Sequence, residues 1–233
     1  LRRRGSTLAT EGNLNNDIGV PLTLLRLNTE HGYAVIEMGA NHHGEIAYLT
    51  GLARPDVAII NNAGPCHLEG FGDVAGVARG KGEIFQGLSA TGVAIVNRDD
   101  PHADDWIGLN PGRRIVDFGL DRPAAVSARV LDAAINRFHL IVPAGETEIR
   151  LPLPGRHNIR NALAAAAGAL AAGATLDDIR QGLESLHDVG GRLQRLRGRH
   201  GGTVIHDAYN ANPASLAAAL HTVGAGPGRK WLV

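Results

Sequence analysis

Cysteine, lysine and long hydrophobic runs are scarce in this chain of 233 residues. The single cysteine, Cys66, excludes a disulfide within the chain and is typical of proteins from a reducing compartment. The longest weakly polar run, residues 162–174, is mostly alanine and too short to cross a bilayer, and polar residues follow the arginines at positions 2–4. We therefore expect neither membrane insertion nor a signal peptide. The formal net charge is zero, which gives no electrostatic reason to expect nucleic acid as a partner.

Lysine occurs only as Lys81 and Lys230, among 23 lysines and arginines in total. An amine can lose its proton and react, whereas a guanidinium group stays charged. The lysine within GVARGKGEIF is therefore either kept for reactive chemistry or an ordinary surface residue. Composition leaves both interpretations open.

Short β-branched runs alternate with helical segments in the first half of the chain, which indicates βαβ units. The predicted strands are 7–10, 33–38, 56–60 and 92–96, and the predicted helices include 45–52 and 74–88. From Arg113 the segments RIVDFG, VSARVL, RFHLIV and TEIRLPL are short strands separated by turn residues. The expected fold is α/β, with a mainly parallel sheet flanked by helices and an added antiparallel patch.

A long alanine-rich helix is predicted to begin near HNIRN, followed by a helix at 176–186 with Thr175 as its N-cap. Gly190-Gly191 is the best candidate for a domain boundary, which divides the chain into 1–189 and 190–233. The second part should contain a strand at 203–206, a helix at 214–223 and a terminal strand at 231–233.

Three predicted strands are followed by polar side chains at their carboxyl ends, where parallel α/β sheets bind ligands. Glu37 lies at the carboxyl end of the first of these strands, His67 lies in the loop after the second, and the third ends in Asn97, Asp99 and Asp100. We expect one shared site, in which Glu37 and His67 bind a divalent metal or act as an acid and base. Magnesium suits a site with few protein ligands, although imidazole is an unusual ligand for it. The alternative for His67 is a histidine whose hydrogen bonds are satisfied within its loop.

The sequence has no phosphate-binding loop, because neither GxxxxGK[ST] nor a GxGxxG that opens a helix is present. Either the cradle of a nucleotide site lies upstream of Leu1 or the chain does not belong to a nucleotide-binding protein. The chain starts without methionine and ends in what resembles the opening of a strand, so we expect it to be a piece of a longer protein.

Asparagines and one aspartate mark three further candidate binding positions. The loop with Asn13, Asn15 and Asn16 forms either a turn or a ligand contact. Asn158 and Asn161 lie three residues apart at a predicted helix start, where they could bind an adenine edge, and helix capping is the alternative for Asn158. Asp207 could bind a ribose hydroxyl or a metal-bound water, or belong to a helix cap.

Eight stretches together carry a resemblance to a known family: TEGNLNNDIGVPLTLL, YAVIEMGANHHGEIA, NNAGPCHLEGFG, ARGKGEIF, VNRDD, LPLPGRHNIRNALAAAA, GGRL and DAYNANPAS. In this order and spacing they resemble the Mur ligases of peptidoglycan synthesis over nearly the whole chain. GNLNNDIGVP and HLEGFG favour the members that add D-alanyl-D-alanine to UDP-N-acetylmuramoyl-tripeptide.

The resemblance implies a three-domain, cytoplasmic, monomeric enzyme that uses ATP and Mg²⁺. This chain would be the central ATP-binding domain without its phosphate-binding loop (1–189) and the beginning of a Rossmann-like C-terminal ligase domain (190–233). We expect the chain alone to be inactive. The alternatives are another Mur ligase, a folylpolyglutamate synthase or a non-catalytic nucleotide-binding domain.

The same resemblance implies roles for individual residues. Glu37, His67 and Lys81, the last as a carbamate, would hold magnesium and serve catalysis. The expected ATP-binding residues are Asn97, Asn158, Asn161, Arg192 and Asp207. The expected substrate-binding residues are Asn13, Asn15, Asn16 and Asn210.

Overall fold

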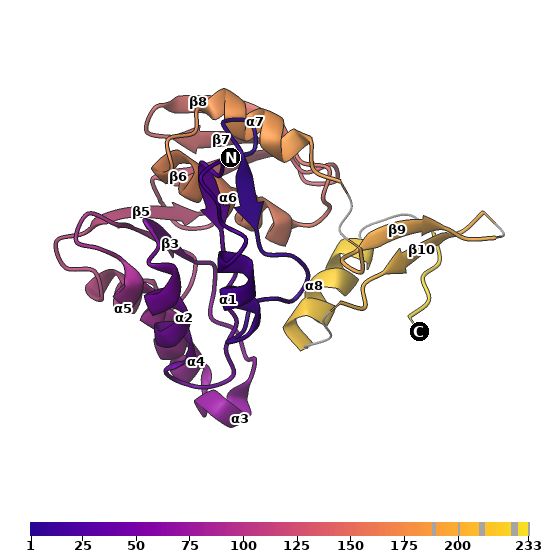
Figure 1. Ribbon diagram of the computed structural model, residues 1–233. Coiled ribbons are helices and arrows are strands. Elements are labelled where there is room, and N and C mark those ends of the chain that lie inside the picture. Colours follow the sequence, from indigo (N-terminus) through magenta and orange to yellow (C-terminus); the bar gives the residue numbers. More distant parts are fainter. Residues whose placement is uncertain (188–189, 200, 210–212, 225–227, 233) are drawn as a thin grey trace.

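A computed structural model of the protein describes residues 1–187, 190–199, 201–209, 213–224 and 228–232. Figure 1 shows a larger body of sheets and helices and a smaller C-terminal part, drawn in yellow, beside it. No helix within these ranges is long and apolar enough to cross a membrane.

Six strands form the main sheet in the order β3-β4-β5-β6-β7-β8. They are β3 (Val57–Ile60), β4 (Val93–Asn97), β5 (Arg114–Gly119), β6 (Val126–Asp132), β7 (Arg137–Val142) and β8 (Gly145–Arg150). β3 to β6 run parallel, whereas β6, β7 and β8 are antiparallel. This confirms the predicted α/β fold with an antiparallel patch.

The antiparallel patch begins one strand later than the sequence predicts. RIVDFG is β5, which pairs in parallel with both of its neighbours. Five residue pairs join β5 to β4, but only Phe118–Val126 and Gly119–Ser127 join it to β6. β5 therefore belongs to the parallel half, because a short apolar run does not specify its pairing partner.

The first two strands lie outside this sheet, which corrects the expectation of a single sheet. β1 (Thr7–Ala9) and β2 (Tyr33–Val35) form a separate parallel pair. β2 ends at Val35 instead of Met38. Ile36 and Met38 pack against a small core formed with α1 (Gly19–Leu24) and α2 (Glu45–Ala53), so tertiary packing overrides the β-branched pattern there.

The remaining helices of the larger body are α3 (Leu68–Phe71), α4 (Val74–Gly82), the 3₁₀ helix η1 (Glu83–Gly87), α5 (Ala103–Gly108), α6 (Arg156–Ala171) and α7 (Leu176–Glu184). The helices predicted at 45–52 and 176–186 are confirmed to within two residues. Thr175 caps α7 in a capping box with Asp178.

The helix predicted at 74–88 is α-helical only as far as Gly82 and continues as η1. The hydroxyl of Thr50, a residue of α2, donates to the carbonyl oxygen of Ile84 at 2.9 Å. The amide of Leu88 bonds to Phe85, three residues back, as in a 3₁₀ turn. Contact with α2 therefore tightens the helix.

β4 is buried on both faces and separates two cores. Val93 and Ile95 pack into a core with residues of α6 and α7, and Ala94 and Val96 pack into a second core with residues of α4 and α5. This explains why the sequence of β4 is continuously apolar. The small face of α6 lies close to β3, because a Cβ on Gly168 would lie 2.6 Å from the Ile59 side chain.

The C-terminal part contains β9 (Gln194–Arg197), β10 (Thr203–His206) and α8 (Pro213–Gly224). The strand at 203–206 is confirmed, but it pairs with β9 as an antiparallel hairpin, which the sequence did not predict. Trp231 and Leu232 are not in a strand, and Val233 lies outside the described residues. Within the described part, β10 therefore has no parallel partner.

Candidate active site

Lys81 lies in the last turn of α4, half-buried, with its Nζ 2.7 Å from the carbonyl oxygen of Asn62. α4 is held close to its neighbours. The Trp106 indole donates to the Ala78 carbonyl at 2.9 Å, and a Cβ on Gly80 would lie 2.4 Å from the Phe71 ring. The Lys81 amine is thus fixed beside the loop that follows β3.

His67 ends that loop and precedes α3. Its backbone is left-handed, with φ of 52°, and its side chain is exposed. A non-glycine residue in this region is uncommon and is frequently found at functional sites. The ring is therefore presented to solvent at the start of α3 and is not packed inside the loop.

Glu37 is exposed just beyond the end of β2. Its backbone amide donates to the Thr10 hydroxyl at 2.9 Å, and its carboxylate accepts a hydrogen bond from the Asn15 amide at 2.9 Å. Asn16 instead accepts from the amides of Ile18 and Gly19, as in a turn. Asn16 therefore shapes a turn and Asn15 contacts Glu37, while a ligand contact of this loop stays a prediction.

The loops that carry Glu37 and His67 are neighbours, as predicted, but a common sheet is not the cause. A Cβ on Gly70 of α3 would lie 1.9 Å from the carbonyl oxygen of Asn41, so α3 touches the loop that follows Glu37. The rings of His43 and Phe71 meet edge to face at 5.1 Å. Packing of α3 on the 39–44 loop brings the two segments together.

The residues in this region suit magnesium better than a metal that requires many protein ligands. Within the described ranges, no group of three or more histidine, cysteine, aspartate or glutamate side chains could hold a metal ion. Glu37 is an exposed carboxylate, and Mg²⁺ often takes one or two carboxylates together with waters and phosphate oxygens. As an ammonium ion Lys81 would repel a metal, whereas a carbamate on Lys81 would supply oxygen ligands.

The predicted asparagines are connected through Asn61, at the carboxyl end of β3. Buried Asn97 donates to the Asn61 carbonyl at 2.8 Å, and the Asn61 side chain donates to Asn161 at 2.9 Å. Asn161 is 3.3 Å from Asn158, which donates to Pro154 at 2.6 Å. Asn158 is therefore not the N-cap of α6; Gly155 holds that position. The structure brings Asn97, Asn158 and Asn161 together.

Sequence reasoning did not single out Asn61, whereas it expected Asp99 and Asp100 at the shared site beside Asn97. The buried carboxylate of Asp100 accepts from the backbone amide of Ala63 at 2.7 Å. The carboxylate of Asp99 accepts three backbone amides of the loop after β5, those of Leu120, Asp121 and Arg122, at 2.7 to 3.0 Å. These hydrogen bonds give the consecutive carboxylates of VNRDD the partners that they need after a buried strand.

Arg192 and Asp207 are in the C-terminal part. The Arg192 guanidinium stacks 4.0 Å from the centre of the Tyr209 ring, and Asp207 accepts the Leu193 amide at 2.9 Å. Asp207 is not in the cap of α8, which begins at Pro213. Asn210 lies outside the described residues. Asn13, Asn15 and Asn16 lie in the loop before α1.

The C-terminal part contacts the start of α6, near the asparagines. A Cβ on Gly155 would lie 2.8 Å from the hydroxyl of Thr222 in α8. Burial lowers the pKa of His157, the Asp207 carboxylate raises it in part, and the Arg160 guanidinium lowers it further. Asp207 therefore acts electrostatically on the first turn of α6.

Comparison with known proteins identifies the family. The profile of the Mur ligase middle domain matches residues 1–169. The UDP-N-acetylmuramoyl-tripeptide–D-alanyl-D-alanine ligase of Escherichia coli is 47% identical over 100% of this chain and 52% of its own length. A crystal structure of MurF from Acinetobacter baumannii matches 98% of this chain and 50% of its own, at 42% identity and a TM-score of 0.93.

A crystal structure of a MurF ligase from Thermotoga maritima in complex with ADP matches 98% of this chain and 53% of its own, at 27% identity and a TM-score of 0.85. The chain thus spans about half the length of the relatives it matches. The fold, the family profile and these likenesses agree. The chain belongs to the Mur ligase family, and residues 1–169 match its middle domain.

Proposed function

We propose that the protein to which this chain belongs is an ATP-dependent ligase that adds D-alanyl-D-alanine to UDP-N-acetylmuramoyl-tripeptide in peptidoglycan precursor synthesis. The observation that carries the proposal is the 47% identity, over the whole chain, to a relative with that name. Residues 1–189 would form part of the ATP-binding domain, and residues 190–233 would begin the C-terminal ligase domain. We place the enzyme in the cytoplasm as a monomer.

The connected asparagines form the proposed adenine site. An amide side chain has two N–H groups and one oxygen. The oxygen of Asn161 accepts from Asn61 and one N–H is directed at Asn158, which leaves a donor for an adenine nitrogen. Asn97 would hold the Asn61 backbone in place beneath it. The Thermotoga maritima relative was crystallised with ADP, which supports a nucleotide site in this fold.

Glu37, His67 and Lys81 form the proposed metal site. When bound, Mg²⁺ would screen the negative charges of the phosphates and the attacking carboxylate. Glu37 would offer a carboxylate oxygen, oriented by the hydrogen bond from Asn15. Neutral Lys81 would add to carbon dioxide through Nζ and lose a proton, and the resulting carbamate would give an oxygen ligand in place of a cation.

The proposed reaction has two steps. The terminal carboxylate of the tripeptide attacks the γ-phosphate of ATP, which gives an acyl phosphate and ADP. The amine of D-alanyl-D-alanine then adds to the acyl carbon, and the tetrahedral intermediate expels phosphate as the amide bond forms.

Arg192 and Asp207 would reach the nucleotide from the C-terminal part. Asn13, Asn15, Asn16 and Asn210 would contact the peptide substrate. Domain closure would exclude water, which hydrolyses acyl phosphates.

An isotope experiment on the full-length protein tests this proposal. UDP-N-acetylmuramoyl-tripeptide carrying ¹⁸O in its terminal carboxylate should transfer one labelled oxygen to inorganic phosphate when ATP and D-alanyl-D-alanine are present. Mass spectrometry of the phosphate detects the transfer. Product formation without labelled phosphate would contradict the acyl phosphate, and absence of product would favour a non-catalytic nucleotide-binding domain.

A further inference from the structure

Glu83 has hydrogen-bond partners that none of the proposed roles uses. Its side chain is 14% exposed, and its carboxylate accepts the backbone amide of Gly44 at 2.8 and 3.0 Å and that of Ala47 at 3.2 Å. The ring nitrogen of His43 lies 3.8 Å away. These partners belong to the beginning of α2 and the loop before it, distant in sequence from Glu83.

The beginning of α2 requires such a partner. Gly44 is the N-cap residue, has a left-handed φ of 87°, and has no side chain to accept the first free amides. A carboxylate placed there also interacts favourably with the positive end of the helix dipole. Glu83 therefore supplies, from η1, the cap that α2 lacks.

The loop between Glu37 and α2 is held from a second side. Glu45 turns back and accepts the backbone amides of Asn41 and His42 at 2.7 and 3.3 Å. The amide of Asn41 lowers the pKa of Glu45 most, followed by the side chain of His42, so this carboxylate is ionised. The 39–44 loop is thus closed on itself by Glu45 and attached to η1 by Glu83.

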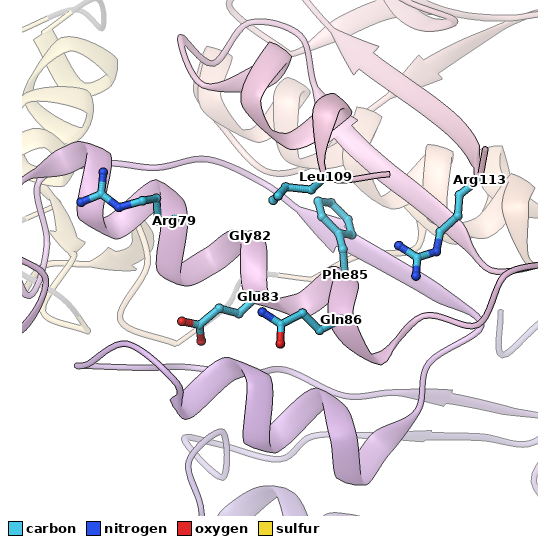
Figure 2. A pocket seen from close by; sticks show the side chains of 7 residues that line it. All are labelled: Arg79, Gly82, Glu83, Phe85, Gln86, Leu109 and Arg113. Carbon is cyan, nitrogen blue, oxygen red and sulfur yellow. The ribbon is translucent and has the colours of Figure 1, made fainter. Parts of the chain in front are cut away.

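Glu83 follows Lys81 by two residues in one continuous helical segment. From that segment Lys81 reaches the Asn62 carbonyl, while Glu83 reaches Gly44. Figure 2 shows the side chains of Glu83 and Gln86 on the same side of the segment, next to the helix below it. The end of α4 therefore binds the loop after β3 with one residue and the loop after Glu37 with another.

We propose that Glu83 is a positioning residue that sets the separation between Glu37 and Lys81. The inference rests on the proposed function, in which both of those residues serve the metal. Without the Glu83 carboxylate, the start of α2 would lose its external acceptor, and the loop that follows Glu37 would move relative to α4. Glu83 itself would not touch the metal or the nucleotide.

The test uses the full-length protein with Glu83→Ala, Glu83→Gln and, as a matched control, Gln86→Ala, an exposed residue of η1. The first measurement is the Mg²⁺ concentration for half-maximal ligase activity. We expect Glu83→Ala to raise it about tenfold, as for other residues that orient a metal ligand. The KM for D-alanyl-D-alanine should stay unchanged. Glu83→Gln keeps a carbonyl oxygen that can accept from Gly44, so it should recover most of the loss, and Gln86→Ala should change neither quantity.

The second measurement is amide hydrogen exchange of residues 39–47, which does not depend on activity. We expect faster exchange in Glu83→Ala and wild-type exchange in Gln86→Ala. Unchanged exchange would show that Glu83 does not hold the 39–44 loop against η1, the attachment that we call the clamp. Faster exchange with unaltered Mg²⁺ dependence would show that Glu83 only caps α2, and would overturn the positioning role. A wild-type protein without ligase activity would refute the proposed function and with it that role, while the exchange data would still test the clamp.

Discussion

Lys81 shows what can be learned from a single residue. Its rarity in an arginine-rich chain was consistent with reactive chemistry and with an ordinary surface role, and the structure places it half-buried with Nζ 2.7 Å from a backbone carbonyl. Residue types identified the candidate carboxylates, imidazole and asparagines, and Asn97, Asn158 and Asn161 do lie together. Asn61 was not predicted as a site residue, because its role depends on partners 36 and 100 positions away in sequence.

Lys81→Ala in the full-length protein should abolish most of the ligase activity, because it removes the amine that would carry the carbamate. Short carboxylic acids such as formate or acetate should restore part of the activity by supplying the missing oxygen ligand. Phosphate release with and without the added acid measures both effects. Lys230→Ala, at the only other lysine, should behave as wild type. Wild-type activity in Lys81→Ala would remove the proposed role.

His157 should make stability depend on pH. In the unfolded chain its pKa is about 6.5, whereas burial lowers the pKa in the folded protein. As pH falls below about 6.5 the unfolded chain therefore binds the proton first, and the free energy of unfolding decreases until the lower folded-state pKa is reached. At pH values above this window His157 does not make the free energy of unfolding depend on pH, because its ring is neutral in both the folded and the unfolded chain.

Urea unfolding at a pH of about 7.5 and of about 5.5, on either side of the unfolded pKa, measures this effect. His157→Gln should show a smaller loss of stability on acidification than wild type. His187→Gln, at an exposed histidine, is the control, and on acidification it should lose as much stability as wild type. An equal loss in wild type and His157→Gln would contradict the assignment to His157.

At the scale of elements, the sequence predicted where helices and strands lie better than it predicted which of them contact one another. β4 was recognisable because a strand buried on both faces is continuously apolar. Placing β2 in the same sheet was wrong, since Ile36 and Met38 pack on a helical core after the strand ends. The contact that joins the Glu37 and His67 loops is a close approach at Gly70, and a glycine in a sequence does not reveal which backbone it touches.

Gly70→Ala should separate those two loops. Its Cβ would lie 1.9 Å from the Asn41 carbonyl oxygen, which is backbone and cannot turn away. Overpacking of this kind costs about 1–3 kcal/mol, so the urea midpoint should fall. Gly64→Ala is the matched control, because no heavy atom lies within 4 Å of its Cβ position. Equal midpoints for the two variants would contradict this description of the contact.

At the scale of the whole molecule, the chain presents one body with the candidate metal and adenine residues and a C-terminal part that contacts the start of α6 (Figure 1). The domain boundary at Gly190-Gly191 stays a prediction, and the hairpin of β9 and β10 was not predicted, because its arginine-rich first strand lacks an apolar pattern. The chain covers about half of its relatives' length, so turnover is a property to be measured on the full-length protein.

The most direct test of the account is phosphate release from ATP by the full-length protein. The assay contains UDP-N-acetylmuramoyl-tripeptide, with and without D-alanyl-D-alanine, and parallel reactions replace the dipeptide by a single amino acid or the acceptor by a folate. The account predicts sustained release only with the tripeptide and D-alanyl-D-alanine together, and no ligase turnover from residues 1–233 alone. Release with a single amino acid or a folate instead, or no release with any combination, would contradict it.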